Sequence, residues 1–416
     1  MKVTSEMGEP KLHDVAIIGG GLVGASLACA LAPLGLRVVL LEAVAFRSAS
    51  QPSYDDRTLA LSASSCNILK ALGLWSDIEA DATPIRQIQV RELDRPGRVV
   101  MDPYEMGLDR FGHVVEARSI GATLNRVLPE LANVEVVCPA QVSSLEAGED
   151  ATRLSVEGKG VEKTIETRLL VGADGAESFV RESLGIATER HDYDQSAVIC
   201  NVTPEQEHRG RAFELFTPTG PMAVMPHVGG RCGLIWCVPG DAVGELMALP
   251  EQEFLRRANQ RFGRRLGRFL KVGRRSAYPL RLVRALEDVR PRTVLIGNAA
   301  HAIHPVGAQG FNLGLRDAAA LAEVLVEAMR GDAQADPGGW DLLCRYSAWR
   351  KPDHDGTIAY SDGLARIYAN PTRAASLGRL AGLMAHAFVP GLRRQLALKS
   401  MGFRGRVPKL ARGESL

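Results

Sequence analysis

The chain has 416 residues, of which 46% are hydrophobic and 24% charged, a balance that excludes disordered and fibrous proteins and leaves room for two or three packed units. A formal net charge of +2 gives no general nucleic-acid-binding surface. No run approaches the roughly 18 to 20 apolar residues that cross a bilayer. The opening stretch, MKVTSEMGEPKLHD, lacks the apolar core of a secretory signal, and we therefore expect a cytoplasmic protein.

The first predicted unit is a strand, a helix and a second strand within HDVAIIGGGLVGASLACALAPLGLRVVLLEA. The apolar run Val15–Ile18 is typical of a strand buried on both faces. In the G-x-G-x-x-G pattern that follows, Gly19 permits a tight turn, Gly21 lets the backbone approach a pyrophosphate, and Gly24 lets the helix pack closely on the strand. The second strand ends at Glu42, which is suitably placed to accept hydrogen bonds from an adenosine ribose. This order predicts a dinucleotide-binding unit but does not distinguish NAD from FAD.

Two later stretches also run from a buried strand through a loop into a helix. In RLLVGADGAESFVRESLG, Asp174 and Gly175 follow the strand; they are also ordinary turn residues, and Ser178 fits a helix cap. In TVLIGNAAHAIHPVGAQGFNLGLRD, the strand Val294–Ile296 leads to a glycine-containing loop and a helix from Asn312 onward. Ligands of open parallel sheets bind beyond the carboxyl ends of the strands, so we expect the three loops to converge on one cofactor.

In this order, the three motifs resemble those of the FAD-dependent aromatic hydroxylases with the p-hydroxybenzoate hydroxylase fold. The resemblance covers nearly the whole chain and extends to the ubiquinone-biosynthesis hydroxylases, in the branch called 2-polyprenyl-6-methoxyphenol hydroxylase. The supporting stretches are YDDRTLALSASS, GRAFELFTPTGPMAVMP, GRCGLIWCVP and RSAYPL. The resemblance implies FAD as cofactor and NAD(P)H as electron donor. It also implies an α/β protein with a Rossmann-like FAD-binding domain, a mixed β-sheet substrate domain and a C-terminal helical region.

We expect a division into three parts. A discontinuous FAD-binding domain comprises residues 12–75, 110–182 and 285–330. A substrate-binding β-sheet domain comprises residues 76–109 and 183–284, and a helical region with a basic tail comprises residues 331–416. Short alternating runs between Arg190 and Tyr278 predict a β layer over the flavin. The candidate pocket residues of this layer are Met222, Val224, Met225, Leu234 and Trp236. The alternative is that they pack in the core, as such side chains usually do. The stretch GDAQADPGG predicts a loop at Gly331–Gly339.

By resemblance, the activity is hydroxylation of the aromatic ring of a polyprenylated phenol in ubiquinone biosynthesis, with NAD(P)H and O₂, through a flavin C4a-hydroperoxide. Such chemistry requires the protein to bind, orient and exclude water, and it needs no side-chain nucleophile. The alternatives are another flavin oxidoreductase of this fold, such as an isoprenoid reductase or an aromatic hydroxylase outside ubiquinone synthesis, and a non-catalytic flavin-binding component of a biosynthetic complex. A halogenase would need a W-x-W-x-I-P element, whereas the chain offers only Trp236-Cys-Val-Pro.

The resemblance places Arg57 and Pro305 in the flavin environment, and Arg118 near the FAD phosphates or adenine. Arg57 could instead pair with Asp55 or Asp56. Backbone N–H groups at the start of the last motif's helix could face the pyrimidine edge of the flavin, since a helix N-terminus favours negative charge. The complete set of predicted cofactor-binding residues is Gly19, Gly21, Gly24, Glu42, Arg57, Arg118, Asp174, Gly175, Asn298, Gly307, Gln309, Gly310, Phe311 and Asn312.

The third motif departs from the wider family at two positions. Asn298 stands where the family usually has an Asp that contacts the ribityl chain, although an amide can also hydrogen-bond a hydroxyl. The segment Gly307-Ala308-Gln309-Gly310 replaces the more common Ala-Gly-Gln-Gly. If the backbone at Ala308 needs a positive φ, the loop is strained there.

Histidines and cysteines do not predict a metal site. His301 and His304 have H-x-x-H spacing, but they lie in a loop with no neighbouring Cys or acid in the sequence. We expect them to pack within the loop, with acid–base catalysis as the alternative. The seven cysteines are scattered, and the spacing of Cys232 and Cys237 places them on opposite faces of a strand, which disfavours a disulfide.

The C-terminal stretch, GLRRQLALKSMGFRGRVPKLARGESL, alternates basic and apolar residues. It suits either an anionic membrane surface or a solvated tail. The expected partners are therefore a polyprenylated phenol, O₂, the inner face of a membrane as a peripheral contact, and other enzymes of ubiquinone biosynthesis, without nucleic acid.

Overall fold

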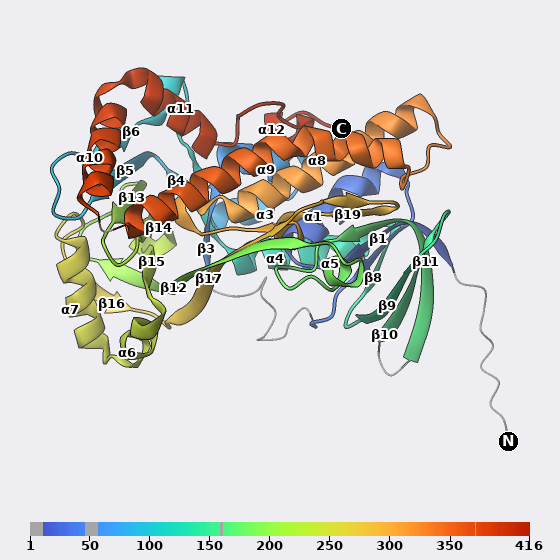
Figure 1. Ribbon diagram of the computed structural model, residues 1–416, viewed down its shortest axis with the longest axis horizontal. Helices are drawn as coiled ribbons and strands as arrows, with labels where there is room; N and C mark the ends of the chain where they lie inside the picture. Colours follow the sequence, from blue (N-terminus) through green and yellow to red (C-terminus); the bar gives the residue numbers. More distant parts are fainter. Residues whose placement is uncertain (1–10, 46–56, 159–160, 371) are drawn as a thin grey trace.

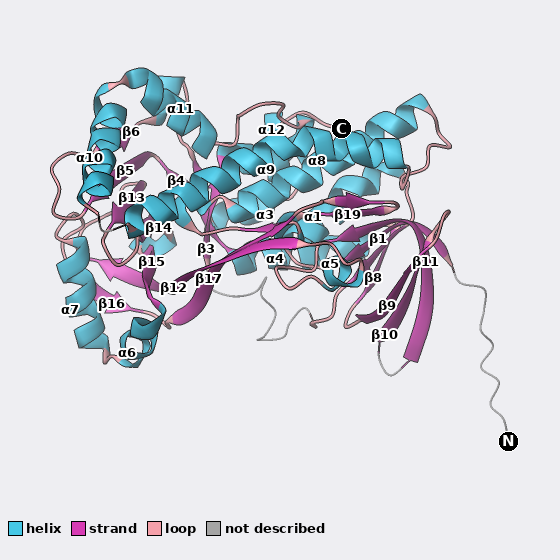
Figure 2. Cartoon of the chain, in the orientation of Figure 1, coloured by secondary structure: helices cyan, strands magenta, loops and turns pink. Residues whose placement is uncertain are grey.

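The structure is a computed structural model, and it describes residues 11–45, 57–158, 161–370 and 372–416 (Figure 1). Two large sheets, one small sheet and a layer of long helices make up this part of the chain (Figure 2). None of the helices in it is long and apolar enough to cross a membrane.

The first sheet has a parallel core in the order β19-β11-β1-β2-β8, with β18 on one edge and the β9–β10 hairpin paired to β11. Its strands are β1 (Leu12–Ile18), β2 (Val38–Leu41), β8 (Val134–Val137), β9 (Gln141–Ala147), β10 (Thr152–Gly158), β11 (Val161–Gly172), β18 (Val289–Arg290) and β19 (Thr293–Leu295). In β1, Val15 and Ile17 pack into a core shared with helices, whereas Ala16 and Ile18 pack into a second core on the opposite face. Burial on both faces explains why these strands are continuously apolar.

Helices cover one face of this sheet. They are α1 (Leu22–Leu31), α4 (Ala117–Val127) and α8 (Gly310–Gly331), and the long α9 (Trp340–Ala369) lies along α8 (Figure 1). Helices α2 (Ala63–Ala71) and α3 (Trp75–Ile78) extend the same core, and α5 (Phe179–Ser183) contributes to the opposite one. Residues 332–339 separate α8 from α9, which confirms the loop predicted there.

The second sheet has nine strands in the order β20-β17-β12-β15-β14-β13-β5-β6, with β16 paired to β12. They are β5 (Gln87–Glu92), β6 (Val99–Met101), β12 (Thr188–Pro204), β13 (Arg211–Phe216), β14 (Met222–Pro226), β15 (Cys232–Pro239), β16 (Phe269–Val272), β17 (Ser276–Ala285) and β20 (His301–Ala302). The predicted β layer is therefore confirmed. Helices α6 (Val243–Ala248) and α7 (Glu251–Phe262) pack on one face of it.

A third, small sheet contains β3 (Thr58–Ser62), β7 (Gly112–Glu116) and β4 (Thr83–Ile85). The strands of the first sheet all fall within the segments expected for FAD binding. However, β20, which belongs to the third motif, pairs with β17 of the second sheet. The third motif thus connects the two large sheets, and the exact division into domains stays a prediction.

The C-terminal segment contains α10 (Arg373–Phe388) and α11 (Pro390–Ser400), which fold back over the second sheet, and the short α12 (Lys409–Arg412), which packs on α2 and α8. Helices α10 and α11 lie over β6, at the upper left of Figure 1. Leu396, Leu398, Met401 and Phe403 belong to an apolar cluster with residues of β4 and β6. A freely solvated tail is thus wrong for this stretch, because several of its apolar residues are core residues.

Candidate active site

The three predicted loops leave neighbouring strands in register. Ile18 at the end of β1 lies opposite Gly172 at the end of β11, and Gly172 lies opposite Leu295 of β19. The next residues are joined by backbone hydrogen bonds, from Ala173 N to the Ile18 carbonyl at 2.8 Å and from Ile296 N to the Gly172 carbonyl at 2.9 Å. The glycine box (Gly19–Gly24), the Asp-Gly motif (Asp174–Gly175) and the third motif (Gly297–Asp317) therefore begin at one edge of the sheet, as expected for a cofactor site in an open parallel sheet.

Two glycines of the glycine box, Gly19 and Gly24, have no room for a side chain. A Cβ atom at Gly19, whose φ is +105°, would lie 2.3 Å from the Ala173 carbonyl oxygen, and one at Gly24 would lie 2.1 Å from the carbonyl oxygen of Gly19. Gly21 precedes the first turn of α1, and no side chain caps that turn. The N–H groups at the start of α1 consequently face the loop without a capping side chain, which suits a pyrophosphate.

Glu42 is placed against this loop. Its Oε2 accepts a hydrogen bond from Gly20 N at 2.7 Å and its Oε1 accepts one from Val44 N at 2.7 Å. The residue is 8% exposed, and each carboxylate oxygen retains a second lone pair for a hydroxyl group. The acid predicted to meet the ribose thus lies beside the glycine box.

The Asp-Gly motif contains a buried oxygen that the protein leaves unsatisfied. Asp174 Oδ2 accepts a hydrogen bond from Val180 N at 3.0 Å, whereas Oδ1 has no partner within the described residues. Burial raises the pKa of Asp174. Gly175 has a φ of +91°, and Ser178 caps α5, because its Oγ accepts from Arg181 N at 3.1 Å. A buried polar atom without a partner fits a cofactor hydroxyl at this point.

Arg181 links the second and third motifs. Its guanidinium donates to the carbonyl of Ala176 at 2.6 Å and to that of Ala299 at 2.9 Å. Asn298, next to Ala299, is exposed on the loop, where its amide can reach a bound ligand. Gly297 has a φ of +59°, and a Cβ atom at Gly314 of α8 would lie 2.9 Å from its Cα, so the loop and the helix touch through their glycines.

The end of the third motif has the strained backbone that its sequence suggested. Gly307 has a φ of +73° and Ala308 a φ of +51°, in the left-handed region that disfavours a Cβ atom. Asn312 holds this turn, donating to the Ala308 carbonyl at 2.7 Å and to that of Ala60 at 2.8 Å, and accepting from Ser62 N at 2.9 Å. The side chain of Asn312 therefore binds the protein itself.

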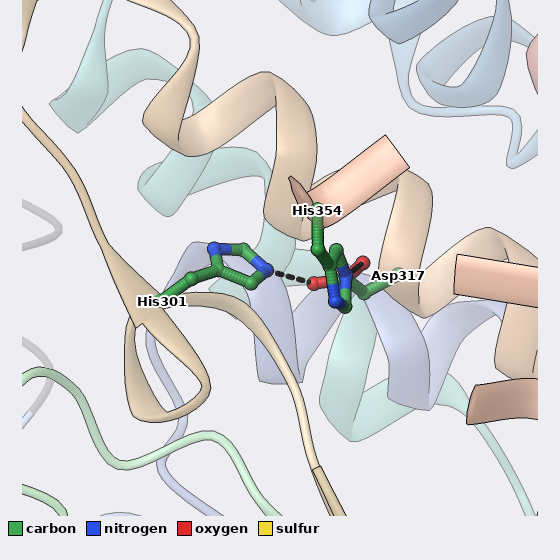
Figure 3. Close-up of side chains that lie close together, drawn as sticks. All are labelled: His301, Asp317 and His354. Atoms are coloured by element: carbon green, nitrogen blue, oxygen red, sulfur yellow. Dashed lines mark hydrogen bonds and ion pairs between the residues drawn. The ribbon is translucent and has the colours of Figure 1, made fainter. Parts of the chain in front are cut away.

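Asp317 is the centre of a buried network in which residues of α8, α9 and the third motif meet (Figure 3). Its Oδ2 accepts from His301 Nε2 at 2.6 Å and from Gly297 N at 3.1 Å. Its Oδ1 accepts from Arg350 Nε at 2.8 Å and from His354 Nε2 at 2.7 Å. Burial alone would raise the pKa of Asp317, but His354, His301 and Arg350 more than offset it and hold the pKa well below its usual range.

This network corrects the expectation that no acid lies near His301. His301, Asp317 and His354 come close enough to resemble a metal centre. However, four donors already occupy the two carboxylate oxygens, and one of them is the guanidinium of Arg350, whose charge would repel a cation. The arrangement instead anchors the third-motif loop to two helices. Sequence spacing could not reveal it, since Arg350 and His354 belong to a separate helix.

His304 lies apart from this network and is 1% exposed. Its Nδ1 accepts a hydrogen bond from Val306 N at 3.1 Å, and its ring packs edge-to-face on Tyr193 at 4.9 Å between centroids. Burial lowers the pKa of His304 to about 4, so the ring is neutral at physiological pH. These contacts agree with packing within the loop.

The two arginines predicted near FAD lie close together, just before β3 and in the first turn of α4. The Arg57 guanidinium lies 5.2 Å from the centroid of the Tyr278 ring, and the Arg57 carbonyl accepts from Ala117 N at the start of α4. Arg118 pairs with Glu116 and its side chain is half exposed. The alternative partners of Arg57, Asp55 and Asp56, lie outside the described residues. The cofactor roles of both arginines stay predictions.

A cavity of about 300 Å³ adjoins the third motif. Residues 305–309 and Asn312 form one end, strands of the second sheet form a wall, and α9 and α10 close the other side. The lining is predominantly apolar and includes Ile88, Val90, Met101, Phe111, Met225 and Ile235. Gly378 and Gly382 of α10 line the cavity and are also exposed, so it reaches the surface there.

The cavity uses a different face of the sheet from most predicted pocket residues. Of the five candidates, Met225 lines the cavity. The prediction was wrong for Met222, Val224, Leu234 and Trp236, which pack in the core under α7. Side chains alternate between the faces of a strand, and here both faces are apolar, so the sequence could not identify the one that faces the cavity. Cys232 and Cys237 do lie in separate clusters, as their spacing predicted.

The site has the features of a dinucleotide-cofactor site in an open parallel sheet: three loops at one edge, a glycine cradle and an adjoining apolar cavity. A family model described as "FAD binding domain" matches residues 13–358, and the chain belongs to this family. The chain is accordingly an FAD-dependent aromatic monooxygenase.

Relatives support this class along the full length. The chain is 37% identical over 409 residues to ubiquinone hydroxylase UbiL of Rhodospirillum rubrum, which covers 98% of this chain and 94% of that protein. It is 33% identical over 397 residues to 3-demethoxyubiquinol 3-hydroxylase of Escherichia coli, covering 94% and 98%. Among solved structures, p-nitrophenol 4-monooxygenase PnpA from Pseudomonas putida DLL-E4 has the same fold, with a TM-score of 0.78, 23% identity, and coverage of 95% of this chain and 99% of that one.

Proposed function

We propose that this monooxygenase hydroxylates the aromatic ring of a polyprenylated phenol, of the 2-polyprenyl-6-methoxyphenol type, in ubiquinone biosynthesis. The observation that carries the proposal is the apolar cavity of about 300 Å³ that begins at the third motif and reaches the surface at α10. Ligand cavities of about 300 to 1,000 Å³ with few polar groups suit a hydrophobic small molecule. The names of the relatives, UbiL and 3-demethoxyubiquinol 3-hydroxylase, point to the same substrate class.

The cavity suits a molecule with a ring at one end and a chain at the other. The ring would lie near Pro305 and Ala308, and the prenyl chain would leave past Gly378 and Gly382. Both of these glycines have open space where a Cβ atom would lie. A chain longer than the cavity can therefore extend to the surface without displacing α10.

Bound FAD supplies the redox chemistry, because it accepts hydride from NAD(P)H and activates O₂ for transfer of one oxygen atom to an electron-rich ring. The glycine box, Glu42 and Asp174 would hold the adenosine and pyrophosphate side of the cofactor, and Asn298 its ribityl chain. Gln309 precedes α8 without capping it by its side chain, so the first N–H groups of that helix are available to a negatively charged flavin edge. Pro305 shapes the loop without presenting a backbone donor, and the apolar walls exclude water.

The activity is tested with the purified FAD-loaded enzyme, NADH or NADPH, O₂ and short-chain 2-polyprenyl-6-methoxyphenols. We expect substrate-stimulated NAD(P)H oxidation and a product with one additional hydroxyl group on the ring. Reduction of a prenyl double bond would favour the isoprenoid reductase. Oxidation that yields only H₂O₂ with every phenol would contradict the proposal, and bound FAD that NAD(P)H does not reduce would favour a non-catalytic component.

We also propose that α10 and α11 dock the enzyme on an anionic bilayer. From Gly363 to Gly413 the sequence has ten Lys and Arg residues and no Asp or Glu. Large apolar side chains near the end of α9 and on these two helices are exposed: Ile367 39%, Leu377 66%, Phe388 74%, Val389 46% and Leu392 37%. Exposed apolar groups among basic ones suit a surface of anionic lipids. The cavity reaches the surface at the same helix, so a lipid-soluble phenol could enter from the membrane.

Vesicle sedimentation tests this surface. We expect binding to vesicles that contain phosphatidylglycerol, weaker binding at high salt, and loss of binding in Phe388→Asp. Leu286→Asp is the matched control, because Leu286 is 61% exposed but lies between β17 and β18. Equal binding by both variants would contradict the bilayer, and a wild type that sediments only with other ubiquinone-biosynthesis enzymes would assign the surface to a protein partner.

A further inference from the structure

Glu214 occupies a position in β13 that the pattern of the strand would give to an apolar residue. Ala212, Glu214 and Phe216 alternate along one face of β13 and line the cavity. Leu215 points the other way and packs in the core with α7. An ionisable side chain is therefore presented to the predominantly apolar cavity.

The Glu214 carboxyl has no partner within the described part of the chain, where it forms neither a hydrogen bond nor an ion pair. Arg379 also lines the cavity, but it donates to Glu92 at 2.9 Å and to the carbonyls of Ile367 at 2.9 Å and Asn370 at 2.8 Å. Lys399 lies over the Tyr360 ring at 4.1 Å and donates to the Gly356 carbonyl at 2.9 Å. The nearby cations are thus committed to other groups.

Burial without a partner has a measurable consequence for the carboxyl. Burial raises the pKa of Glu214 to about 7. The other titratable groups around it are Tyr360 and Tyr368 of α9 and Cys237 of β15, and burial raises the pKa of each of them as well, so they remain protonated at neutral pH. His386 of α10 donates its Nδ1 proton to the Gly382 carbonyl at 2.8 Å. Glu214 is therefore the acid in this cavity that changes its charge near neutral pH.

An unpaired carboxyl in an apolar cavity destabilises the fold, and a leucine would avoid the cost. The presence of the Glu214 carboxyl is explained if the bound ligand supplies the hydrogen-bond donor that the protein does not. A phenol has one hydrogen-bond donor, its hydroxyl group. The cavity is otherwise apolar enough to hold the ring, and a carboxylate is the natural acceptor of that donor.

We infer that Glu214 is the catalytic base of the reaction, which accepts the hydrogen bond of the phenolic hydroxyl and takes its proton during oxygen transfer. The inference rests on the proposed function, since it needs a phenolic substrate. The O–H bond breaks and the proton forms a bond to the carboxylate. The electron pair left on oxygen enriches the ring, whose carbon then forms a C–O bond with one oxygen atom of O₂ as the O–O bond breaks. NAD(P)H supplies the two electrons that this cleavage consumes. The carbon loses its hydrogen as a proton, which restores aromaticity, and the second oxygen atom takes up that proton and leaves as water. Glu214 returns the first proton to the phenolate oxygen.

The kinetic test compares wild type, Glu214→Gln and Glu214→Asp over a range of pH. For wild type we expect kcat/KM to rise with pH through an apparent pKa near 7, as a carboxylate base requires. Glu214→Gln should lose this limb and about 10²-fold or more in kcat, the range reported for general bases. Glu214→Asp should retain the limb at a lower rate. Phenols with electron-withdrawing substituents, which ionise without help, should restore much of the Glu214→Gln rate, a rescue that a purely structural role would not give.

A binding test separates this inference from the proposed function, because it needs no turnover. Wild type should bind a short-chain prenyl phenol at least tenfold more tightly than its O-methyl ether, and Glu214→Leu should discriminate less than threefold. Glu189→Gln, on an exposed position of β12, is the control and should behave as wild type in both tests. Unchanged discrimination in Glu214→Leu, or an unchanged pH limb in Glu214→Gln, would overturn the inference. Discrimination without hydroxylation of any phenol would instead reject the proposed reaction.

Discussion

Asp317 Oδ2 accepts a hydrogen bond from His301 Nε2 at 2.6 Å, across 16 residues of sequence that include most of the third-motif loop. Through this contact, Asp317 in α8 holds His301 in the first half of the loop. The N-terminus of the same helix forms the end of the loop. The same oxygen accepts from Gly297 N at 3.1 Å, so the residue that follows β19 is fixed as well. The position of the loop therefore depends on one buried carboxylate.

Asp317→Asn should destabilise the protein by about 3 kcal/mol, the lower end of the usual cost of breaking a buried ion pair. Among the described residues, Arg350, which is 1% exposed, would keep only Asp353, at 2.8 Å, as an ionic partner. Urea unfolding of the FAD-loaded protein measures the change. Asp241→Asn, at an exposed position, should stay within about 0.5 kcal/mol of wild type. Equal stability of the two variants would show that the network does not anchor the loop.

Ala308→Gly tests the strain in the third motif. With a φ of +51°, Ala308 is in a conformation that costs an L-residue about 1 to 2 kcal/mol, and glycine adopts it freely. The relief of strain is partly offset, because glycine has greater chain entropy in the unfolded state, which costs about 0.5 to 1 kcal/mol of stability. We therefore expect a net stabilisation of up to about 1 kcal/mol.

The control for this variant is Ala302→Gly in the strand β20, where glycine removes a side chain without relieving strain. It should lower stability by about 0.5 to 1 kcal/mol. Thermal unfolding of both variants decides the matter, since the two changes should move Tm in opposite directions. A lower Tm for Ala308→Gly would mean that the backbone is not strained at this position.

Much of the cofactor edge could be predicted from the sequence because its signals are local. Each of the three motifs is a contiguous strand and loop, and the parallel arrangement then brings Gly19, Asp174 and Gly297 to one edge. The partners of Asp317 could not be predicted, since they depend on how α8 packs on α9, with His354 37 residues away. Glu214 was also missed, because a single carboxylate within a short strand is ordinarily read as a solvent-facing residue. A charged residue between cavity-facing Ala212 and Phe216 was the available signal.

Acid should destabilise the protein through its buried histidines. Burial lowers the pKa of both His113 and His304 to about 4, below the value of about 6.5 of an exposed histidine. Between these two values the unfolded chain binds more protons than the folded one, so stability is complete above pH 6.5 and falls as the pH decreases toward 4.

His304→Asn isolates one of these contributions, since Asn Oδ1 can accept from Val306 N in place of Nδ1. Compared with wild type, this variant should lose less stability between pH 7.5 and pH 4.5, by on the order of 2 kcal/mol. Urea unfolding at the two pH values gives the difference. An identical pH dependence of the two proteins would mean that folding does not lower the pKa of His304.

Gly382→Leu tests the route of the prenyl chain past α10. Open space surrounds Gly382, and leucine favours a helix by nearly 1 kcal/mol over glycine, so the fold should tolerate the change. The new side chain would narrow the cavity where it reaches the surface. We expect kcat/KM for long-chain phenols to fall about tenfold, a loss of roughly 1.4 kcal/mol in transition-state binding, while short-chain phenols are little affected.

Gly391→Leu in α11 is the control, because Gly391 also has open space around it and does not line the cavity. Its kinetics should match wild type for every chain length. A Gly382→Leu variant that treats long and short chains alike would place the prenyl chain elsewhere.

The assignment as a monooxygenase of polyprenylated phenols is decided by mass spectrometry of the product formed under ¹⁸O₂. The FAD-loaded enzyme is supplied with NAD(P)H and a short-chain 2-polyprenyl-6-methoxyphenol. We predict one ¹⁸O atom in the new ring hydroxyl group of each product molecule. A product whose new oxygen comes from water, or consumption of NAD(P)H and ¹⁸O₂ to H₂O₂ without any hydroxylated ring, would contradict it.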